Sequence, residues 1–164
     1  MLELYLYSTI FPPYTKAMQV SINSEAEMKA FGAQLARTMM AAGRARLLEL
    51  IGDVGAGKTT LVKGLALGLG IEEEVASPSF TISRVYDAEG GRRLYHYDFY
   101  RLTDAGILRD ELAEVLRDPE AFTVIEWAEI VDDVLPEPHI RLTIRATGET
   151  TREITIYGIE GDAA

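Results

Sequence analysis

A chain of 164 residues, of which 48% are hydrophobic and 26% charged, has the size and composition of one globular domain. It contains no cysteine, which excludes disulfides and thiolate metal sites, and no apolar run approaches the roughly 18 residues that cross a bilayer. A net charge of −10 argues against a free-standing nucleic-acid binder, because binding to a phosphate backbone depends on Lys and Arg. We therefore expect a cytoplasmic protein without membrane or DNA partners.

The start of the chain differs from the rest. Residues 1–17 have no basic segment and are interrupted by Pro12 and Pro13, unlike a secretory signal. The regular pattern begins at Met18, which we hypothesise to be the natural start of the protein. The preceding residues would then be either sequence read from a point upstream of that start or a loosely ordered extension. We expect a single domain over residues 18–160.

The first predicted elements are a strand, a helix and a second strand. Residues 19–22 have the pattern of a short strand, and Ser24 with Glu27 three residues later forms a capping box that begins a helix. Residues 45–51 are almost continuously apolar, which is typical of a central strand. Between these two strands, apolar residues recur at helical spacing and Gly43 is expected to end the helix. The apolar residues are Met28, Phe31, Leu35 and Met39.

A glycine-rich loop follows the second strand directly. Its residues 52–59, Gly-Asp-Val-Gly-Ala-Gly-Lys-Thr, match the phosphate-binding pattern G-x-x-x-x-G-K-[ST] between a strand and a helix. Glycines let backbone N–H groups point inward, and the N-terminus of the following helix adds positive potential. Lys58 is expected to reach the β- and γ-phosphates, and the Thr59 hydroxyl to bind Mg²⁺. The nucleotide would be held by Gly55, Ala56, Gly57, Lys58, Thr59 and Thr60.

The remaining pattern completes the predicted fold. The helix that starts at Lys58 contains Gly64 and Gly68, which lower helix propensity. We expect them to allow a close approach to the sheet, and the alternative is that the helix simply tolerates them. The order of elements predicts a three-layer α/β domain, like that of P-loop NTPases, with a mixed parallel and antiparallel central sheet. Its later elements are expected as a hairpin, a helix and three strands, at residues 81–86, 93–98, 105–116, 122–125, 140–146 and 152–157.

Two carboxylates at strand ends are candidates to complete a magnesium site. Glu126 follows the apolar residues 122–125, and Asp98 ends residues 94–97. Mg²⁺ prefers octahedral oxygen ligands and usually takes a carboxylate, directly or through water. We place Glu126 nearer the metal, because its strand is more apolar and so more central, and expect Asp98 to orient metal-bound or attacking water. The alternative is that one of them only caps a strand end.

Further residues have both a functional and a structural interpretation. Residues 77–81, Ser-Pro-Ser-Phe-Thr, stand where P-loop enzymes place a switch segment, although composition alone indicates a turn. His96 is expected to be half-buried and hydrogen-bonded, and Trp127 to pack or to cover the nucleotide. No base-reading motif is visible, and the segments near Ser24 and Thr147 are candidates to hold adenine. Solvated surface charge is favoured over a basic patch for Arg84, Arg92, Arg93 and Arg101.

Four segments together resemble the TsaE family of bacterial tRNA threonylcarbamoyladenosine biosynthesis. They are residues 55–60, 77–81, 96–101 and 125–127, in matching order and spacing, and the resemblance spans residues 18–157. It implies an ATPase that supports the TsaD and TsaB proteins, whose complex attaches a threonylcarbamoyl group to the adenosine beside the tRNA anticodon. Contact with tRNA would be indirect, and hydrolysis weak until the partners stimulate it.

The resemblance also implies residue roles. Lys58, Asp98 and Glu126 become the catalytic residues, and Thr59 and Glu126 the metal ligands. Trp127 becomes a functional aromatic residue near the site. Where the family usually has threonine, this chain has Ser79, which keeps the hydroxyl group.

Rival classes of nucleotide-binding protein differ in the motifs that they require. A guanine-specific protein would need an Asn-Lys-x-Asp element, but the only asparagine is Asn23, upstream of the loop, so ATP is the expected nucleotide. A small-molecule P-loop kinase stays open as an alternative, although no segment combines an arginine-bearing lid with an acceptor pocket. A nucleotide-sensing binding module without useful turnover is the other alternative.

Overall fold

The computed structural model describes residues 18–43, 46–136 and 139–158. The expected N-terminal extension and the last two residues of the expected domain lie outside this part of the chain. The elements in chain order are β1 (Met18–Ile22), α1 (Glu25–Ala42), β2 (Leu47–Ile51), α2 (Lys58–Gly68), β3 (Ser83–Asp87), η1 (Glu89–Gly91), β4 (Arg93–Asp98), α3 (Ile107–Val115), β5 (Ala121–Glu126), η2 (Ala128–Val134), β6 (Ile140–Ala146) and β7 (Arg152–Tyr157).

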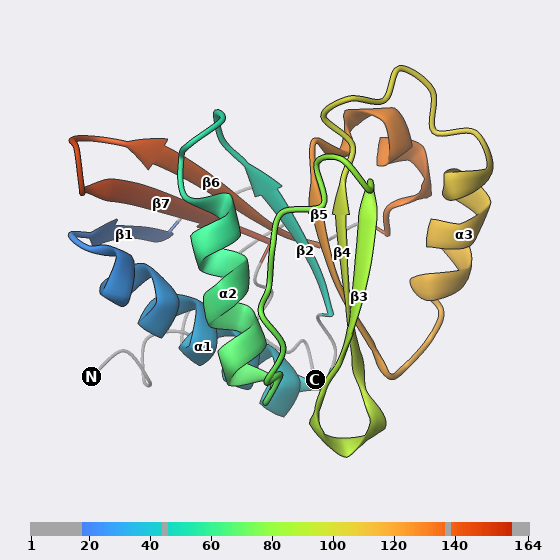
Figure 1. Cartoon of the computed structure of the whole chain (residues 1–164), viewed down its shortest axis with the longest axis horizontal. Coiled ribbons are helices and arrows are strands. Elements are labelled where there is room, and N and C mark those ends of the chain that lie inside the picture. The colour runs from blue at the N-terminus through green and yellow to red at the C-terminus, as the bar shows by residue number, and fades with distance from the viewer. Residues whose placement is uncertain (1–17, 44–45, 137–138, 159–164) are drawn as a thin grey trace.

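The strands form one seven-stranded sheet in the order β1-β7-β6-β2-β5-β4-β3 (Figure 1). Its middle is parallel, because β2 pairs with both β5 and β6, and β4 pairs with β5. Its edges are antiparallel, with β3 on β4 at one side and β7 between β6 and β1 at the other. The predicted mixed sheet is confirmed, and β2 lies at its centre, as its apolar run indicated.

Helices cover both faces of the sheet, which confirms the three-layer α/β architecture. Figure 1 shows α1 and α2 side by side, with α3 beyond β3, β4 and β5. On the first face, Phe31 of α1 packs into one core with Leu48 and Val124 of the sheet. On the other face, Leu112 of α3 packs into a second core with Ile125. Alternation along the buried strands supplies side chains to both cores.

Helix α1 begins and ends at the predicted signals. The Ser24 hydroxyl accepts a hydrogen bond from the Glu27 backbone N–H at 3.1 Å, and the Glu27 carboxylate accepts one from the Asn23 N–H at 2.7 Å. Gly43 closes the helix with a left-handed φ of 70°. The helix thus has the length that its capping residues predict.

Three elements begin later than the sequence pattern suggested, and the first is β2, which begins at Leu47 rather than at residue 45. Strand β3 begins at Ser83 rather than at residue 81, because Ile82 has a left-handed φ of 69° that interrupts extended backbone. Helix α3 begins at Ile107 rather than at residue 105, because Gly106 stands before it with a φ of 49°. Ala105 is nevertheless buried in the second core.

Gly64 and Gly68 of α2 lie against helix α1. The prediction that they approach the sheet is therefore wrong. A Cβ atom on Gly64 would clash with the backbone oxygen of Lys29, and one on Gly68 with that of Ala33. Gly32 of α1 completes the contact, since a Cβ atom there would lie 2.6 Å from the Leu61 oxygen. Glycine therefore allows the two helix backbones to touch.

Candidate nucleotide-binding site

The glycine-rich loop leaves the carboxyl end of β2, the central strand, and leads into α2. Gly55 and Gly57 adopt φ values of 81° and 108°, which a residue with a side chain rarely adopts. Helix α2 starts at Lys58 directly after the loop. Because β4, β5 and β6 run parallel to β2, their carboxyl ends meet the loop at one edge of the sheet.

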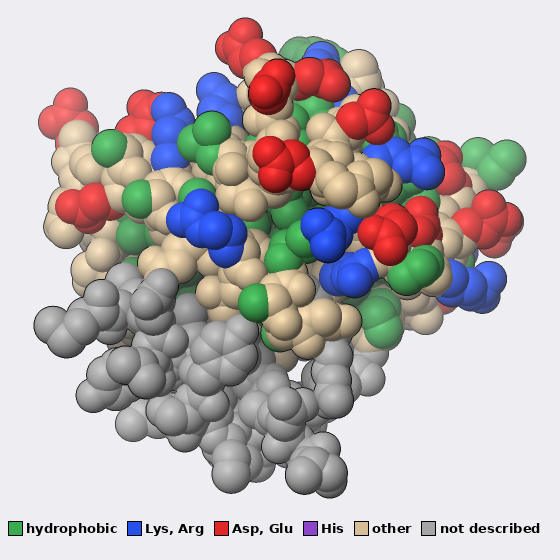
Figure 2. Space-filling view, turned by 90° about the horizontal axis from the view of Figure 1, so that it is seen from below, with side chains coloured by type: hydrophobic (Ala, Val, Ile, Leu, Met, Phe, Trp, Pro, Cys, Tyr) green, Lys and Arg blue, Asp and Glu red, His purple; other side chains and the backbone are tan. Residues whose placement is uncertain are grey.

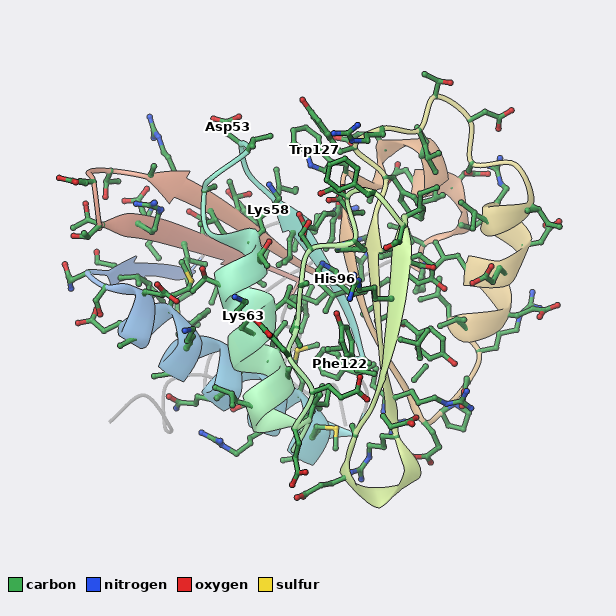
Figure 3. All side chains as sticks on the ribbon, in the orientation of Figure 1. Asp53, Lys58, Lys63, His96, Phe122 and Trp127 are labelled. Atoms are coloured by element: carbon green, nitrogen blue, oxygen red, sulfur yellow. The ribbon has the colours of Figure 1, made fainter. Side chains whose placement is uncertain are left out.

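Lys58 is buried at the base of this loop. Its ammonium group donates to the backbone oxygens of Gly52 at 2.7 Å and Asp53 at 3.0 Å. The same nitrogen lies 3.8 Å from a Glu126 carboxylate oxygen and 5.2 Å from the centre of the Trp127 ring. Figure 3 shows Lys58 and Trp127 at the same edge of the sheet. The lysine is thus held by the loop and faces the end of β5.

Asp98 and Glu126 end neighbouring parallel strands, where they are paired in register. Both are buried. One oxygen of Asp98 accepts a hydrogen bond from the Ser79 hydroxyl at 2.5 Å, and the other accepts one from the Tyr100 N–H at 3.0 Å. The structure therefore brings both sequence-predicted acids to the edge that carries the loop, with Glu126 on the strand nearer to β2.

His96 is completely buried rather than half-buried, with an exposed fraction of 0%. Its Nε2 lies 2.8 Å from Oε1 of Glu126. Because an ionised carboxylate only accepts hydrogen bonds, Nε2 donates. Nδ1 has no hydrogen-bond partner among the described residues. His96 pairs in register with Val124, two residues before Glu126, so it contacts Glu126 from further back along the strands. Figure 3 shows His96 further from the glycine-rich loop than Trp127.

A cavity of about 460 Å³ lies between the loop and the two acids. A second cavity of about 270 Å³ lies on the other side of the loop, beside α1 and the β6–β7 turn. The larger cavity is lined by Lys58, Thr59, Ser77, Ser79, Asp98, Glu126 and Trp127, and the smaller by Ser24, Met28, Glu149, Thr150 and Arg152. Gly55, Gly57 and Thr60 line both cavities, so the loop forms the wall between them.

The predicted switch segment is in direct contact with an acid. The Ser77 and Ser79 hydroxyl oxygens lie 2.7 Å apart, and Ser79 donates to Asp98. The left-handed Ile82 follows, and its carbonyl accepts a hydrogen bond from the Asp98 N–H at 2.8 Å. Serine at position 79 thus donates the hydrogen bond to Asp98 with its hydroxyl group, which threonine would also supply.

Aromatic side chains surround the mouth of the larger cavity. Trp127 lies 4.9 Å from Tyr100 between ring centres. Phe80 is 83% exposed, and the Arg101 guanidinium lies 4.4 Å from its ring centre. Trp127 was predicted to be near the site, whereas Tyr100 was given no role of its own, although it lies in the family segment 96–101.

The arginines considered for a basic patch do not gather. Arg92 and Arg93 stand at the start of β4, whereas Arg101 lies beyond its end. Arg92 approaches Glu120 at 3.8 Å. Figure 2 shows basic and acidic side chains interspersed on the face seen from below. The interpretation as solvated surface charge therefore fits the structure better than a patch.

The oxygen ligands around the larger cavity fit magnesium. The Thr59 hydroxyl and the carboxylates of Asp98 and Glu126 are hard oxygen donors, which Mg²⁺ prefers over nitrogen or sulfur. Within the described part of the chain, no three acidic or histidine side chains cluster closely enough to hold a metal by themselves. A bound Mg²⁺ would therefore depend on water and on oxygens of a ligand.

A glycine loop between a central parallel strand and a helix, facing acids on neighbouring strand ends, defines a protein of the P-loop NTPase class. Residues 22–154 match the family model described as threonylcarbamoyl adenosine biosynthesis protein TsaE. The chain therefore belongs to the TsaE family, which confirms the resemblance of its four sequence segments.

Individual relatives cover most of the domain. The TsaE protein of Treponema pallidum is 44% identical over 117 residues, which are 68% of this chain and 85% of that protein. The TsaE protein of Streptomyces coelicolor is 39% identical over 140 residues, 80% of this chain and 90% of that protein. The crystal structure of Bacillus subtilis YdiB superimposes with a TM-score of 0.67 at 34% identity, covering 89% of this chain and 88% of that one.

The described helices are also informative about membranes. None of them combines the length and the apolar character that crossing a bilayer requires.

Proposed function

We propose that this protein is a cytoplasmic Mg-ATP-dependent ATPase that acts with TsaD and TsaB in tRNA threonylcarbamoyladenosine biosynthesis. The observation that carries the proposal is the position of Lys58, which ends the glycine-rich loop and lies 3.8 Å from Glu126 in the wall of a cavity that Asp98 also lines. Family membership supports the pathway. The partnership rests on the family resemblance.

The phosphate groups of ATP would bind in the loop. The N-terminus of α2 and the glycine backbone supply N–H donors and positive potential there. Lys58 now donates to two loop carbonyls, and it would exchange part of these contacts for phosphate oxygens. Gly55, Ala56, Gly57, Lys58, Thr59 and Thr60 are the proposed phosphate-binding residues.

Two acids and a hydroxyl would organise the reacting end of ATP. Thr59 and Glu126 are the proposed ligands of Mg²⁺, which neutralises developing phosphate charge when it is bound. His96 holds one Glu126 oxygen and leaves the other directed toward Lys58. Asp98, fixed by Ser79 and the Tyr100 N–H, is the proposed acid that orients the attacking water.

The smaller cavity is suited to the nucleoside. It adjoins the loop through Gly55, Gly57 and Thr60, so a nucleotide whose phosphates occupy the loop can extend into it. Ser24 and the turn that follows Thr147 line or border this cavity. These are the two segments for which the sequence suggested an adenine contact.

The proposal is tested by measuring ATP hydrolysis with Mg²⁺, first by the protein alone and then with TsaD and TsaB. We expect weak activity alone, stimulation by the partners, and a loss of roughly 100-fold in both Lys58→Ala and Glu126→Ala, since each removes a charge from the reacting centre. Lys63→Ala, on the same helix but outside both cavities, is the matched control.

Other outcomes assign the protein to a different class. ATP binding without any effect of TsaD and TsaB would contradict the proposed role. Phosphoryl transfer to a small acceptor would indicate a kinase, and binding without turnover under any condition would indicate a nucleotide-sensing module.

A further inference from the structure

Arg152, the first residue of β7, contacts the glycine-rich loop (residues 52–59), here called the phosphate loop, from a distant part of the chain. Its Nε donates to the Ala56 backbone oxygen at 2.8 Å, 96 residues away in sequence, and its Nη2 lies 3.5 Å from the Gly55 oxygen. A Cβ atom on Gly57 would lie 3.9 Å from the same Nε. The guanidinium group therefore lies against three consecutive loop residues.

The other side of the guanidinium group binds the β6–β7 turn. Nη1 donates to the backbone oxygens of Gly148 at 3.0 Å, Glu149 at 3.3 Å and Thr151 at 2.8 Å. The turn itself is closed by a hydrogen bond from the Thr147 N–H to the Thr151 oxygen at 3.0 Å. Arg152 thus joins the loop to a hydrogen-bonded turn.

These contacts determine how one loop amide is oriented. In a trans peptide the carbonyl oxygen and the following N–H point in opposite directions. Because the Ala56 oxygen is held by Arg152, the Gly57 N–H points away from the guanidinium group. The arginine therefore presets an amide at the start of the helix that would bind phosphate.

Among the residues that the structure describes, no ion pair neutralises the charge of Arg152. The hydrogen bonds that it forms all go to backbone carbonyl oxygens, and within the described residues no carboxylate lies within ion-pair distance of it. A positive charge beside the loop attracts phosphate, more strongly in a partly buried site than in water. This matters in a chain whose net charge is −10.

We propose that Arg152 is a positioning residue for nucleotide binding, which holds the phosphate loop in its binding shape and adds positive charge beside it. The inference rests on the proposed function, because it requires that the loop binds the phosphates of a nucleotide. It assigns Arg152 to the phosphates and not to the base.

The test compares Arg152→Gln and Arg152→Lys with the wild-type protein by calorimetric titration of ATP and of inorganic tripolyphosphate. We expect Arg152→Gln to weaken binding of both ligands by about tenfold, the size of a charge-assisted hydrogen bond. Arg152→Lys keeps the charge without the planar fork, so an intermediate loss is expected. Arg145→Gln, on the exposed part of β6 in the same hairpin, should leave both affinities unchanged.

The possible results separate this inference from the proposed function. Wild-type protein that binds neither ligand would contradict the proposed function itself. If wild-type protein binds ATP and both Arg152 variants bind it equally well, the inference is wrong, even where their melting temperatures fall. A loss confined to ATP, with tripolyphosphate binding intact, would also overturn it, because Arg152 would then act on the nucleoside.

Discussion

Ile82 and Trp127 are the described non-glycine residues with left-handed φ values, 69° and 57°. Each lies next to a strand-end acid. Ile82 accepts a hydrogen bond from the Asp98 N–H, and Trp127 directly follows Glu126, whose carbonyl accepts one from the Phe99 N–H at 3.1 Å. Such backbone geometry in bulky residues is unfavourable by about 1–3 kcal/mol each and is concentrated at functional sites. The strain thus accompanies the placement of both acids.

The buried contact between His96 and Glu126 gives a prediction at this scale. We expect His96→Leu to lower the ATPase rate by about tenfold or more, because Glu126 loses the donor that fixes one of its oxygens. His96→Gln, whose side-chain amide can donate from a similar position, should recover part of the rate. Rate measurements with saturating Mg-ATP, beside melting curves of both variants, separate orientation of Glu126 from general stability.

This role for His96 would be contradicted if His96→Gln recovered no activity relative to His96→Leu and the activity of each variant fell only as far as its stability. In that case the histidine would serve only to fill the core.

Some site residues could be predicted from sequence and others could not. The loop motif and the acids at strand ends were found because phosphate binding and parallel-strand topology leave a local pattern. Arg152 was missed, because it contacts backbone oxygens, which every residue carries, on a loop 96 positions away. The full burial of His96 depends on the tertiary packing over its side chain, which the local sequence does not specify.

The contact between α1 and α2 illustrates the same limit for whole elements. Helical periodicity predicted the buried side of α1, and the structure confirms it. Periodicity does not say which neighbour a glycine faces, so the approach of Gly64 to Lys29 was expected at the sheet instead. Glycines on both helices thus permit a close backbone approach that helical periodicity does not reveal.

Gly64→Ala tests how tight this approach is. A methyl group at position 64 would meet the backbone of α1, so we expect the free energy of unfolding to fall by about 1–3 kcal/mol despite the better helix propensity of alanine. Leu67→Ala, on the exposed side of the same helix, is the control, with an expected change within about 0.5 kcal/mol. Urea unfolding measures both.

An increase in stability of about 1 kcal/mol for Gly64→Ala would instead show that helix propensity prevails and that α1 can move aside.

At the scale of the molecule, a second group of buried polar residues, besides His96 and Glu126, lies on the sheet face opposite α1 and α2. Glu49 of β2 lies 2.8 Å from both the His139 Nε2 and the Arg141 Nε. Burial alone raises the pKa of Glu49, but the hydrogen bonds and electrostatic attraction of His139 and Arg141 outweigh it, so that pKa lies below its usual value. This cluster ties β6 to β2 on the far side from the nucleotide cavity.

The lowered pKa of Glu49 predicts how stability depends on pH. A carboxylate with a lower pKa in the folded state stabilises the protein above its unfolded-state pKa of about 4.3, and this contribution is lost as the pH falls through the folded-state pKa. We therefore expect Glu49→Gln to be less stable than wild type by about 1–3 kcal/mol at pH 7, with a difference that shrinks below about pH 4.3.

Urea unfolding at a series of pH values checks this, with Glu114→Gln on the exposed surface of α3 as the control. A stability difference for Glu49→Gln that stays constant down to acid pH would contradict the electrostatic explanation.

The place of β2 between β5 and β6 has a consequence for folding during synthesis on the ribosome. Leu48 pairs with Val124 on one side and with Ile140 on the other, so the strand that carries the loop has both neighbours in the later half of the chain. On the ribosome the loop emerges long before the strands that shape it, and Arg152 follows later still. Folding must therefore wait for pairings between distant segments, which form slowly. A nascent chain would therefore complete the proposed nucleotide site only after Arg152 has been synthesised.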